Sequence, residues 1–248
     1  MKTKNILANT VLDKCTSTND IARKLANSGC PHGAWISAIQ QTSGKGRLGR
    51  SWVSQEGNLF LSIVLRSKKT EHMTWHPLVI AYGVCSALTR KIKNLNIKIK
   101  WPNDLYLNNA KLGGILCEGT TYEQEHFIIA GIGINCLNSP KDLDQKTISL
   151  TEFVSPKTIT ANEIRPLIIA AIVKSFDTFK TQGISWIKGK YSSYALLTPN
   201  TKISWDQTGT HKGTVIGLGP SGELLVENSH ENSQGQVVSL FAEDIRIL

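Results

Sequence analysis

The sequence predicts an α+β fold with a small all-β unit at its C-terminal end. Strand runs joined by hairpin turns, together with clustered helical patterns, favour α+β over a doubly wound fold, in which strand and helix would alternate regularly. Past Pro199 the pattern changes to short alternating strands separated by glycine turns. We therefore expect a main domain over 1–195 and a small β domain over 196–248.

The first four expected elements are a short strand, a helix and two further strands. The helix follows the capping-type side chains of Ser17 to Asp20, and its apolar residues share one face. The first strand is Val11 to Asp13, and the two later strands are Trp35 to Gln40 and Leu59 to Leu65. The apolar face of the helix consists of Ile21, Ala22 and Leu25.

Proline and asparagine mark the boundaries of the middle elements. Pro77 suits the first residue of a helix that runs to about Lys93. The strand from Ile97 to Trp101 must stop at Pro102, because proline cannot donate to a central ladder. Asn108-Asn109 then predicts the turn of a hairpin. The strands of this region are Leu105 to Leu107, Leu112 to Cys117 and Phe127 to Ile134.

Helices are expected again before the C-terminal strands. Thr160 to Glu163 is a capping box that opens a helix through about Lys180. Pro166 lies deep in this pattern, so we expect the helix to kink there or to begin later. A second helix follows over Ile184 to Tyr191, and the tail strands include Gly213 to Gly219 and Glu223 to Glu227.

Composition excludes two classes of protein and indicates a compartment. No stretch approaches the roughly 20 apolar residues that span a bilayer, which argues against an integral membrane protein. The N-terminal segment lacks the apolar region and cleavage site of a signal peptide, so we expect a cytoplasmic protein. The 5 cysteines are odd in number and never spaced as C-x-x-C, which argues against a disulfide framework and against a zinc site.

The formal net charge of +9 indicates an anionic partner. Nucleic acid, a nucleotide, an acidic protein and an anionic lipid all fit, and charge alone does not choose among them. A nucleic-acid binder is supported only by this charge, because the sequence contains neither a recognition helix nor aromatic RNA-reading strands.

A glycine-rich basic loop lies between two of the predicted strands. Gly44 to Gly49 fits the dinucleotide fingerprint G-x-G-x-x-G, and Gly44 to Ser51 nearly fits a phosphate-binding P-loop. Both motifs require a helix after the loop, whereas a strand follows here, so we reject both. Backbone N–H groups at the glycines and the charges of Lys45, Arg47 and Arg50 would still suit a phosphate. An ordinary exposed basic turn is the alternative.

A second candidate site lies on the predicted hairpin. Asp104 stands in a rigid turn, and Lys111 begins the returning strand, so the two charges can lie on adjacent parts of one hairpin. There the carboxylate could orient an amine and remove its proton, and the lysine could offset charge on a reacting phosphate. Gly113 and Gly114 leave room for a ligand against the backbone. Ordinary turn chemistry and a solvated lysine are the alternative.

Five motifs occur in a fixed order along the chain. They are Ser17-Thr18-Asn19, Gln41 to Trp52, Lys100 to Asp104, Lys111 to Leu116, and Gly131 to Asn135. Together they resemble the biotin protein ligase family over essentially the whole chain. The resemblance implies the class II synthetase-like core of the biotin and lipoate ligases, a mixed β-sheet flanked by helices. It also implies that the small C-terminal unit is an SH3-like β-barrel.

The resemblance implies a biotin–[acetyl-CoA-carboxylase] ligase reaction in two steps. The carboxylate of biotin attacks the α-phosphate of ATP, with Mg²⁺ assisting, and gives biotinyl-5′-AMP and pyrophosphate. The ε-amine of a lysine on a biotin carboxyl carrier protein then attacks the mixed anhydride, forming an amide and releasing AMP. The implied partners are biotin, ATP and an acidic carrier domain, and the sequence leaves a homodimer open.

Residue roles also follow from the resemblance. Lys111 would contact the biotin carboxyl end and the α-phosphate, Arg47 would hold the phosphate of the intermediate, and Asp104 would organise metal, phosphate or the incoming amine. The implied biotin-binding residues are Ser17, Thr18, Asn19, Gln41, Gly44, Lys45, Arg47, Lys111, Gly113, Gly114 and Gly131. The implied nucleotide-binding residues are Arg47, Arg50, Trp52, Asn103, Lys111 and Asn135. No fixed protein metal site is implied, since Mg²⁺ would arrive with ATP and lie near Asp104.

The chain departs from the family pattern at one position. The loop of the family usually reads Gly-Arg-Gly-Arg, so Lys45 keeps the charge but loses the bidentate fork of arginine. Like charges and glycines also lead us to expect that Gly44 to Arg50 is mobile without biotin.

Two further interpretations concern regulation and substrate. Relatives with an N-terminal helix-turn-helix domain are biotin-sensing repressors, but Ser17 lies close to Met1, so we expect no direct DNA binding. A lipoate or octanoate ligase shares the core fold but not this glycine loop, and it is the first alternative. A biotin-responsive regulatory protein is the second.

Overall fold

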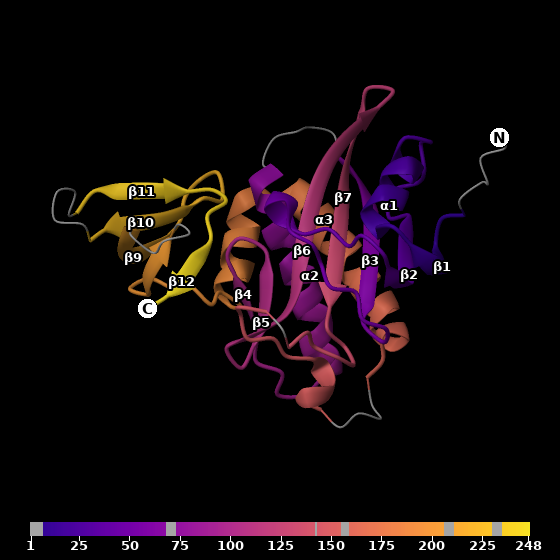
Figure 1. Cartoon of the computed structure of the whole chain (residues 1–248). Coiled ribbons are helices and arrows are strands. Elements are labelled where there is room, and N and C mark those ends of the chain that lie inside the picture. Colours follow the sequence, from indigo (N-terminus) through magenta and orange to yellow (C-terminus); the bar gives the residue numbers. More distant parts are fainter. Residues whose placement is uncertain (1–6, 68–72, 142, 155–158, 206–210, 230–234) are drawn as a thin grey trace.

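The computed structural model describes residues 7–67, 73–141, 143–154, 159–205, 211–229 and 235–248. Their strands form a seven-stranded mixed sheet and a five-stranded antiparallel sheet, which lies to one side of the larger one (Figure 1). Helices flank the larger sheet, so the predicted α+β architecture is confirmed. Within the described ranges, no helix has the length and apolar character needed to cross a membrane.

The main sheet has one parallel pair and is otherwise antiparallel. Helix α1 (Thr18–Ala26) connects the parallel pair, and every other neighbouring pair runs antiparallel. In spatial order its strands are β1 (Thr10–Cys15), β2 (Trp35–Gln41), β3 (Leu59–Ser67), β7 (Glu125–Ile134), β6 (Ala110–Tyr122), β5 (Asp104–Leu107) and β4 (Ile97–Lys100). The strands predicted for this part of the chain are therefore confirmed in place, but their bounds differ. The strand predicted over Leu112 to Cys117 extends to Tyr122 in β6, and the one predicted to Trp101 ends at Lys100.

The two faces of the main sheet have different partners. On β3, Leu61 and Ile63 belong to the larger core, whereas Val64 packs in a second cluster with Ala22 and Leu25 of α1. This alternation follows from the period of two along a strand. The larger core is formed with α2 (His76–Lys91) and α3 (Ala161–Ser192). Helix α1 therefore covers one face of the sheet, and α2 with α3 covers the other.

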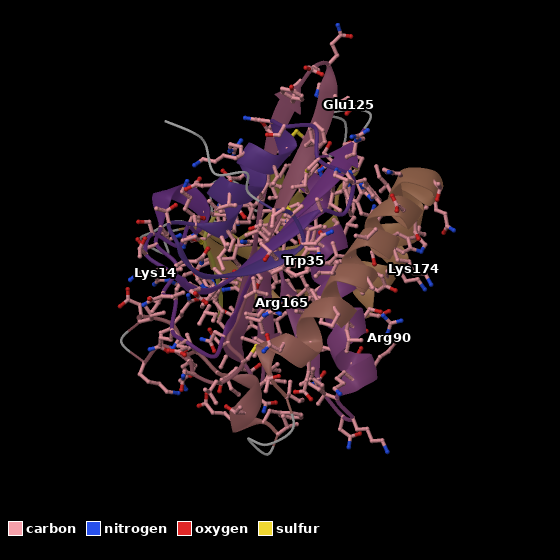
Figure 2. All side chains as sticks on the ribbon, turned by 90° about the vertical axis from the view of Figure 1, so that its right-hand side faces the viewer. Lys14, Trp35, Arg90, Glu125, Arg165 and Lys174 are labelled. Atoms are coloured by element: carbon pink, nitrogen blue, oxygen red, sulfur yellow. The ribbon has the colours of Figure 1, made fainter. Side chains whose placement is uncertain are left out.

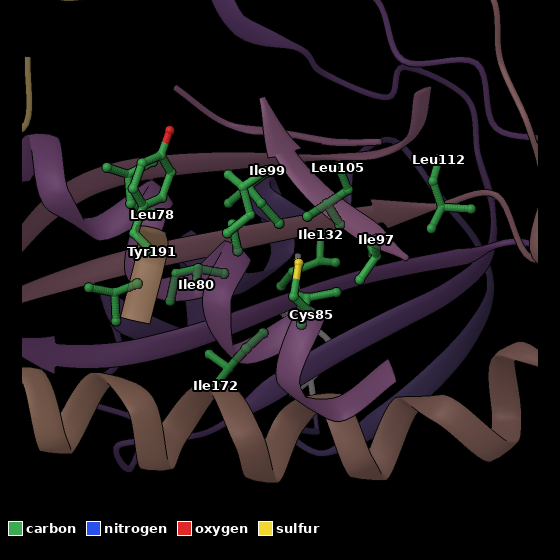
Figure 3. Packing of buried hydrophobic residues seen from close by; sticks show 14 of the residues in the cluster. Leu78, Ile80, Cys85, Ile97, Ile99, Leu105, Leu112, Ile132, Ile172 and Tyr191 are labelled. Carbon is green, nitrogen blue, oxygen red and sulfur yellow. The ribbon is translucent and has the colours of Figure 1, made fainter. Parts of the chain in front are cut away.

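The larger core is a layered packing of two helices on the sheet. Figure 3 shows Ile80 and Cys85 of α2 between Ile172 of α3 and the sheet residues Ile99 and Ile132. All five side chains are fully buried or nearly so. Because such side chains are excluded from water, burial of this core stabilises the packing of α2 and α3 on the sheet.

Helix α3 differs from the prediction at its kink. The predicted capping box is present, with Thr160 Oγ1 accepting from the backbone N–H of Glu163. The helix then continues through Pro166, and its only non-helical residue is Gly183, at φ 70° and ψ −159°. The predicted kink or late start at Pro166 is therefore wrong. The break at Gly183 separates the two helical segments that the sequence predicts, because glycine adopts positive φ readily.

Turns and caps place the remaining boundaries. Asn108 and Asn109 both have positive φ, at 49° and 59°, as the two-residue hairpin turn between β5 and β6 requires. The hairpin of β6 and β7 extends beyond the rest of the sheet (Figure 1), and Glu125 lies at its outer end (Figure 2). Ser17, the first of the capping-type residues Ser17 to Asp20, is the N-cap of α1, but its side chain makes no cap bond, and the helix begins at Thr18.

The small sheet packs against the main core. Its strands are β11 (Val237–Leu240), β10 (Leu224–Asn228), β9 (His211–Leu218), β8 (Lys202–Trp205) and β12 (Ile245–Ile247), in spatial order. Trp75 Nε1 donates to the Pro220 carbonyl at 3.1 Å, and Trp101 Nε1 donates to the Gly222 carbonyl at 2.9 Å. Buried Trp205 of β8 belongs to the same core cluster as the main sheet. The division into domains at residues 195 and 196 stays a prediction.

Candidate active site

A cavity of about 950 Å³ opens on the α1 side of the main sheet. Its wall combines the start of α1, the glycine-rich loop, the β5–β6 hairpin and the segment 243–246, which leads into β12 of the small sheet. One part of this wall, here called the neutral end, consists of Ser17, Thr18, Asn19 and Gln41. The other part, the charged end, consists of Arg47, Arg50, Lys100, Asp104, Lys111, Glu243, Asp244 and Arg246.

The neutral end is buried and internally hydrogen-bonded. Ser17, Thr18 and Asn19 are 2 %, 4 % and 3 % exposed. They begin α1, where the first backbone N–H groups have no partner within the helix. The N–H of Thr18 instead donates to Gln41 Oε1 at 2.8 Å, and Gln41 Nε2 donates to Ser54 Oγ at 3.1 Å. These bonds hold Thr18 and Gln41 in fixed positions before any ligand arrives.

Two glycines of β7 let side chains lie directly on the sheet. A Cβ atom on Gly131 would overlap Asn19 Oδ1, and one on Gly133 would lie 2.6 Å from the Trp52 ring. Trp52 lines the cavity, and its Nε1–H has no acceptor within the described part of the chain. Any larger residue at either glycine would therefore displace the wall of the cavity.

The charged end is built around an ion pair. Lys111 Nζ lies 2.9 Å from Asp104 Oδ2, with side chains 16 % and 21 % exposed. This confirms that the two charges of the hairpin lie together, as the spacing predicts. Lys111 Nζ also lies 5.8 Å from the centre of the Trp52 ring. Burial lowers the pKa of the neighbouring Lys100 from its ordinary value, so a nearby anion would help to keep this ammonium charged.

The glycine-rich loop is anchored at three places. Arg47 donates to Asn103 Oδ1 at 2.8 Å and to the Ala242 carbonyl at 3.0 Å. Arg50 Nη1 lies 3.1 Å from Asp244, and Lys45 Nζ lies 2.5 Å from Asp20 Oδ1 at the start of α1. Burial lowers the pKa of the Arg47 guanidinium. The loop therefore joins the hairpin, the C-terminal segment and α1 around one cavity.

Most of the residues named from the sequence meet in this cavity. Those that line it are Ser17, Thr18, Asn19, Gln41, Lys45, Arg47, Arg50, Trp52, Asn103, Asp104, Lys111, Gly114, Gly131 and Asn135. Gly44 and Gly113 are not among the lining residues. A Cβ on Gly44 would lie 2.5 Å from the Trp52 carbonyl oxygen, and one on Gly113 would lie 2.5 Å from the Gly133 carbonyl oxygen. These two glycines shape the backbone behind the wall.

Other residues at the site were not identified from the sequence. Lys100 and Arg246 line the charged end, and Asp20 pairs with Lys45. Ser62 is fully buried and bonds to Thr18 behind the neutral end. A lone serine inside the apolar run of β3 is a signal that sequence reasoning could have used. Arg246 has no such signal, because only folding brings the C-terminal segment to the cavity.

The arrangement suits a ligand whose two ends differ in charge. The neutral end offers fixed uncharged hydrogen-bonding groups, which suit a polar ring without charge. The charged end holds more cations than anions, among them Arg47 and Lys111. Preorganised cations of this kind stabilise negative charge that develops on phosphate oxygens in a transition state.

Comparisons with known proteins agree with this chemistry. Residues 11–135 match the family described as the biotin/lipoate A/B protein ligase family. The bifunctional ligase/repressor BirA of Bacillus subtilis is 33 % identical over 88 % of this chain and 68 % of the relative. The biotin--[acetyl-CoA-carboxylase] ligase of Paracoccus denitrificans is 29 % identical over 87 % of this chain and 92 % of the relative.

A solved structure of the same kind has a similar fold. The biotin protein ligase from Aquifex aeolicus in complex with biotin and ATP superposes with a TM-score of 0.80 at 28 % identity. The match covers 96 % of this chain and 98 % of that one. It therefore includes both sheets of the present structure.

Proposed function

The chain belongs to the biotin/lipoate A/B protein ligase family, and on that premise we propose that it is a biotin protein ligase that makes and uses biotinyl-5′-AMP. One observation carries the proposal: a single cavity joins a neutral hydrogen-bonding end to a charged end. Biotin has an uncharged ureido ring at one end and a carboxylate at the other, so it matches both. The similar proteins are named as biotin ligases, which favours biotin over lipoate.

The reaction has two steps, each of which forms one bond and breaks another. An oxygen of the biotin carboxylate attacks the α-phosphorus of ATP, and pyrophosphate leaves. The lysine ε-amine of the carrier protein then attacks the carbonyl of the mixed anhydride, forming an amide while AMP leaves with the bonding electrons and a proton is released. Lys111 and Arg47 would offset charge on the α-phosphate in both steps. Asp104, beside Lys111, would orient the incoming amine and receive its proton.

The neutral end would hold the biotin ring. Ser17 and Thr18 are buried and Gln41 is half-buried. The hydrogen bond between Thr18 and Gln41 pre-positions both residues to bind the ring. Asn19 and Gly131 form the floor where the ring would lie against β7. The loop that begins at Gly44, including Lys45, would close over the chain that joins the biotin ring to its carboxylate, with Gly114 on the facing wall. Gly113 would keep the hairpin close to β7.

The charged end would hold the nucleotide. Arg47, Arg50 and Lys111 carry the charges for its phosphates, and Trp52 and Asn103 stand beside them. Asn135 is 3 % exposed, and its Nδ2 donates to the Ile148 carbonyl at 3.2 Å. We propose that its remaining polar atoms contact the nucleotide part of the adenylate.

The donor set fits a magnesium ion carried by ATP. No cluster of three His, Cys, Asp or Glu side chains in the described ranges could hold a metal by itself. Mg²⁺ is commonly bound by one or two carboxylates together with substrate phosphates, and Asp104 supplies one carboxylate to this cavity. When bound there, the ion would neutralise charge on the phosphates.

The proposed macromolecular partner is a biotin carboxyl carrier domain of acetyl-CoA carboxylase type. The cationic side chains that line the cavity would favour an acidic acceptor surface. A homodimer stays a prediction, for which β1, an edge strand of the main sheet, is a candidate surface. The other edge strand, β4, already pairs with the segment 194–196 through Ile99. All five cysteines are unpaired, which supports a reducing, cytoplasmic location.

Intact-mass analysis of a biotin carboxyl carrier domain tests the proposal. The domain is incubated with this protein, biotin and MgATP, with ATP omitted in one arm. We expect a gain of one biotinyl group that requires ATP and disappears with Lys111→Ala. A carrier that gains no mass with biotin, or that gains lipoyl or octanoyl groups instead, would overturn the assignment.

A further inference from the structure

The returning strand of the β5–β6 hairpin has a bulge next to Lys111. Leu105 of β5 lies opposite Gly113, whereas the next residue, Tyr106, lies opposite Lys111, so Leu112 is an extra residue on β6. Leu112 is fully buried in the larger core (Figure 3). A bulge of this kind interrupts the regular hydrogen bonding of a strand pair and changes the direction of the side chains beside it.

The bulge turns the Lys111 side chain into the cavity. Side chains three residues apart on a regular strand point to opposite faces of the sheet. Lys111 and Gly114 are three residues apart, yet both line the cavity, and a Cβ on Gly114 would lie 3.8 Å from Lys111 Cε. Asp104 is paired with Gly114 and therefore lies on the same face. Without the extra residue, Lys111 and Asp104 would lie on opposite faces of the hairpin.

A separate segment holds the bulged strand on its other side. The strand β7 ends before it reaches this position, and residues 146–148 take its place beside β6, with Thr147 in a parallel bridge to Lys111. The Lys111 N–H donates to the Lys146 carbonyl at 2.9 Å, and the Ile148 N–H donates to the Lys111 carbonyl at 3.0 Å. Both backbone groups of Lys111 are thus bonded to this segment.

The side chain of Thr147 ties this segment to the chain that leaves β7. Its hydroxyl donates to the carbonyl of Pro140. Asn135, which is 3 % exposed, adds a second restraint, because its Nδ2 donates to the Ile148 carbonyl at 3.2 Å. Thr147 also lines the cavity, but its single hydroxyl proton is used in the bond to Pro140, so none remains to donate to a phosphate.

We propose that Thr147 is a positioning residue for Lys111: it holds residues 146–148, whose backbone bonds hold the bulged strand so that the Lys111 ammonium faces the reacting phosphate. This rests on the proposed function, because it concerns the residue assigned there to the α-phosphate. Thr147 itself does not act on the reacting atoms. Its effect on the rate can nevertheless be large, since a misplacement of about 1 Å can slow a reaction about 100-fold.

Thr147→Val is the direct test, since it keeps the branched shape and removes the hydroxyl. Without the bond to Pro140, residues 146–148 are less restrained, and the Lys111 ammonium samples more positions. We expect kcat for biotin-dependent pyrophosphate release to fall about tenfold to 100-fold. The dissociation constants of biotin and of ATP, each measured alone by calorimetry, should stay within about twofold of the wild-type values, because no binding group is lost. Thr147→Ser keeps the hydroxyl and should restore most of kcat.

Hydrogen exchange reports the position of the segment independently of activity. The amide protons of Lys111 and Ile148 form the two bonds between the strand and the segment. In unliganded Thr147→Val both protons should exchange at least about tenfold faster than in the wild type, because the segment opens more often. In Thr147→Ser they should exchange at nearly the wild-type rate.

A double-variant cycle distinguishes positioning from a direct effect on the ligand. If Thr147 acts through Lys111, then adding Thr147→Val to Lys111→Ala removes nothing further, because the positioned ammonium is already absent. We expect the double variant to release pyrophosphate within about twofold of the rate of Lys111→Ala alone. A further loss of about tenfold would show that the two residues act independently, and would overturn the inference.

Thr151→Val is the matched control. Thr151 also donates its hydroxyl to a backbone carbonyl, that of Leu137 at 2.8 Å, but it is not among the residues that line the cavity. Its kcat and the exchange of the Lys111 amide should be those of the wild type.

Three results would overturn the inference and leave the ligase assignment intact. They are a wild-type kcat or unchanged Lys111 amide exchange in Thr147→Val, a loss of ATP affinity without a loss of kcat, and an equal loss of kcat in the control. A wild-type protein that releases no pyrophosphate from ATP in the presence of biotin would instead overturn the proposed function, and the inference with it.

Discussion

The neutral and charged ends of the cavity are built in different ways. Thr18 and Asn19 at the neutral end are 4 % and 3 % exposed, and uncharged groups on α1, β2 and β3 hydrogen-bond one another, with the Glu118 carboxylate accepting from Asn19. At the charged end, the side chains of Arg50 and Asp244 are 55 % and 52 % exposed, and the cations hold counter-ions from distant segments. On the proposed function, recognition of the ring would therefore be preorganised in the sheet, whereas the phosphate contacts would require ion pairs to rearrange.

This difference predicts separate effects of substitution at the two ends. A change at the neutral end should alter the affinity for biotin with little effect on the nucleotide. A change at the charged end should alter the rate of adenylate formation or the retention of the adenylate. The following experiments test this separation, from the largest expected effect to the smallest.

Lys111→Ala should have the largest effect. Without the ammonium beside the α-phosphate, we expect pyrophosphate release at saturating substrates to slow by about 100- to 1,000-fold, as for loss of one preorganised transition-state donor. A continuous pyrophosphate assay measures it. Lys24→Ala, on the exposed side of α1, should leave the rate unchanged. A Lys111→Ala protein with the wild-type rate would remove Lys111 from the reaction.

Gly131→Ala should weaken biotin binding selectively. The new methyl group would overlap Asn19 Oδ1, so we expect the affinity for biotin to fall about 100-fold, a cost typical of overpacking. Affinity for ATP should stay within about twofold. Gly189→Ala in α3, where a Cβ would meet nothing within 4 Å, should instead stabilise the protein by about 0.5–1 kcal/mol. An equal loss of biotin and ATP affinity in Gly131→Ala would contradict the separation of the two ends.

Arg47→Gly should loosen retention of the adenylate. Losing a charged hydrogen-bonding group should speed adenylate release by about tenfold or more. The released mixed anhydride would biotinylate lysines on a bystander protein such as albumin, which mass spectrometry detects. Arg90→Gly, remote on α2 (Figure 2), serves as the control. Labelling confined to the carrier at the wild-type rate would show that Arg47 does not retain the intermediate.

Hydrogen exchange should show the smallest and most local difference. Without biotin, the amides of Gly44 to Arg50 should exchange about tenfold faster than with it, because the exposed contacts of the loop open easily. The amide of Thr18 should be protected in both states, since it donates to Gln41. Equally slow exchange of the loop with and without biotin would contradict the prediction that the loop is mobile.

Much of this site could be predicted from local patterns. Asn108-Asn109 specifies a two-residue turn, and this turn brings Asp104 and Lys111 together on adjacent strands. Errors arose where a local rule competed with tertiary packing. The rule for proline predicts a kink at Pro166, yet the helix continues there and breaks at Gly183. The capping-type side chains of Ser17 to Asp20 predict a capped helix start, but the N-cap residue Ser17 makes no side-chain cap bond.

The sequence by itself determined the α+β class, nearly all strand and helix positions, the glycine-rich loop, and the motifs of a biotin ligase. These depend on periodicity, turn residues and short spacings, which act over a few residues. Only the tertiary structure decided that Arg47 reaches the Ala242 carbonyl and that Glu118 faces Asn19. Such pairs are far apart in the chain, so no local pattern encodes them. Their geometry follows from how the two sheets and α1 pack around the cavity.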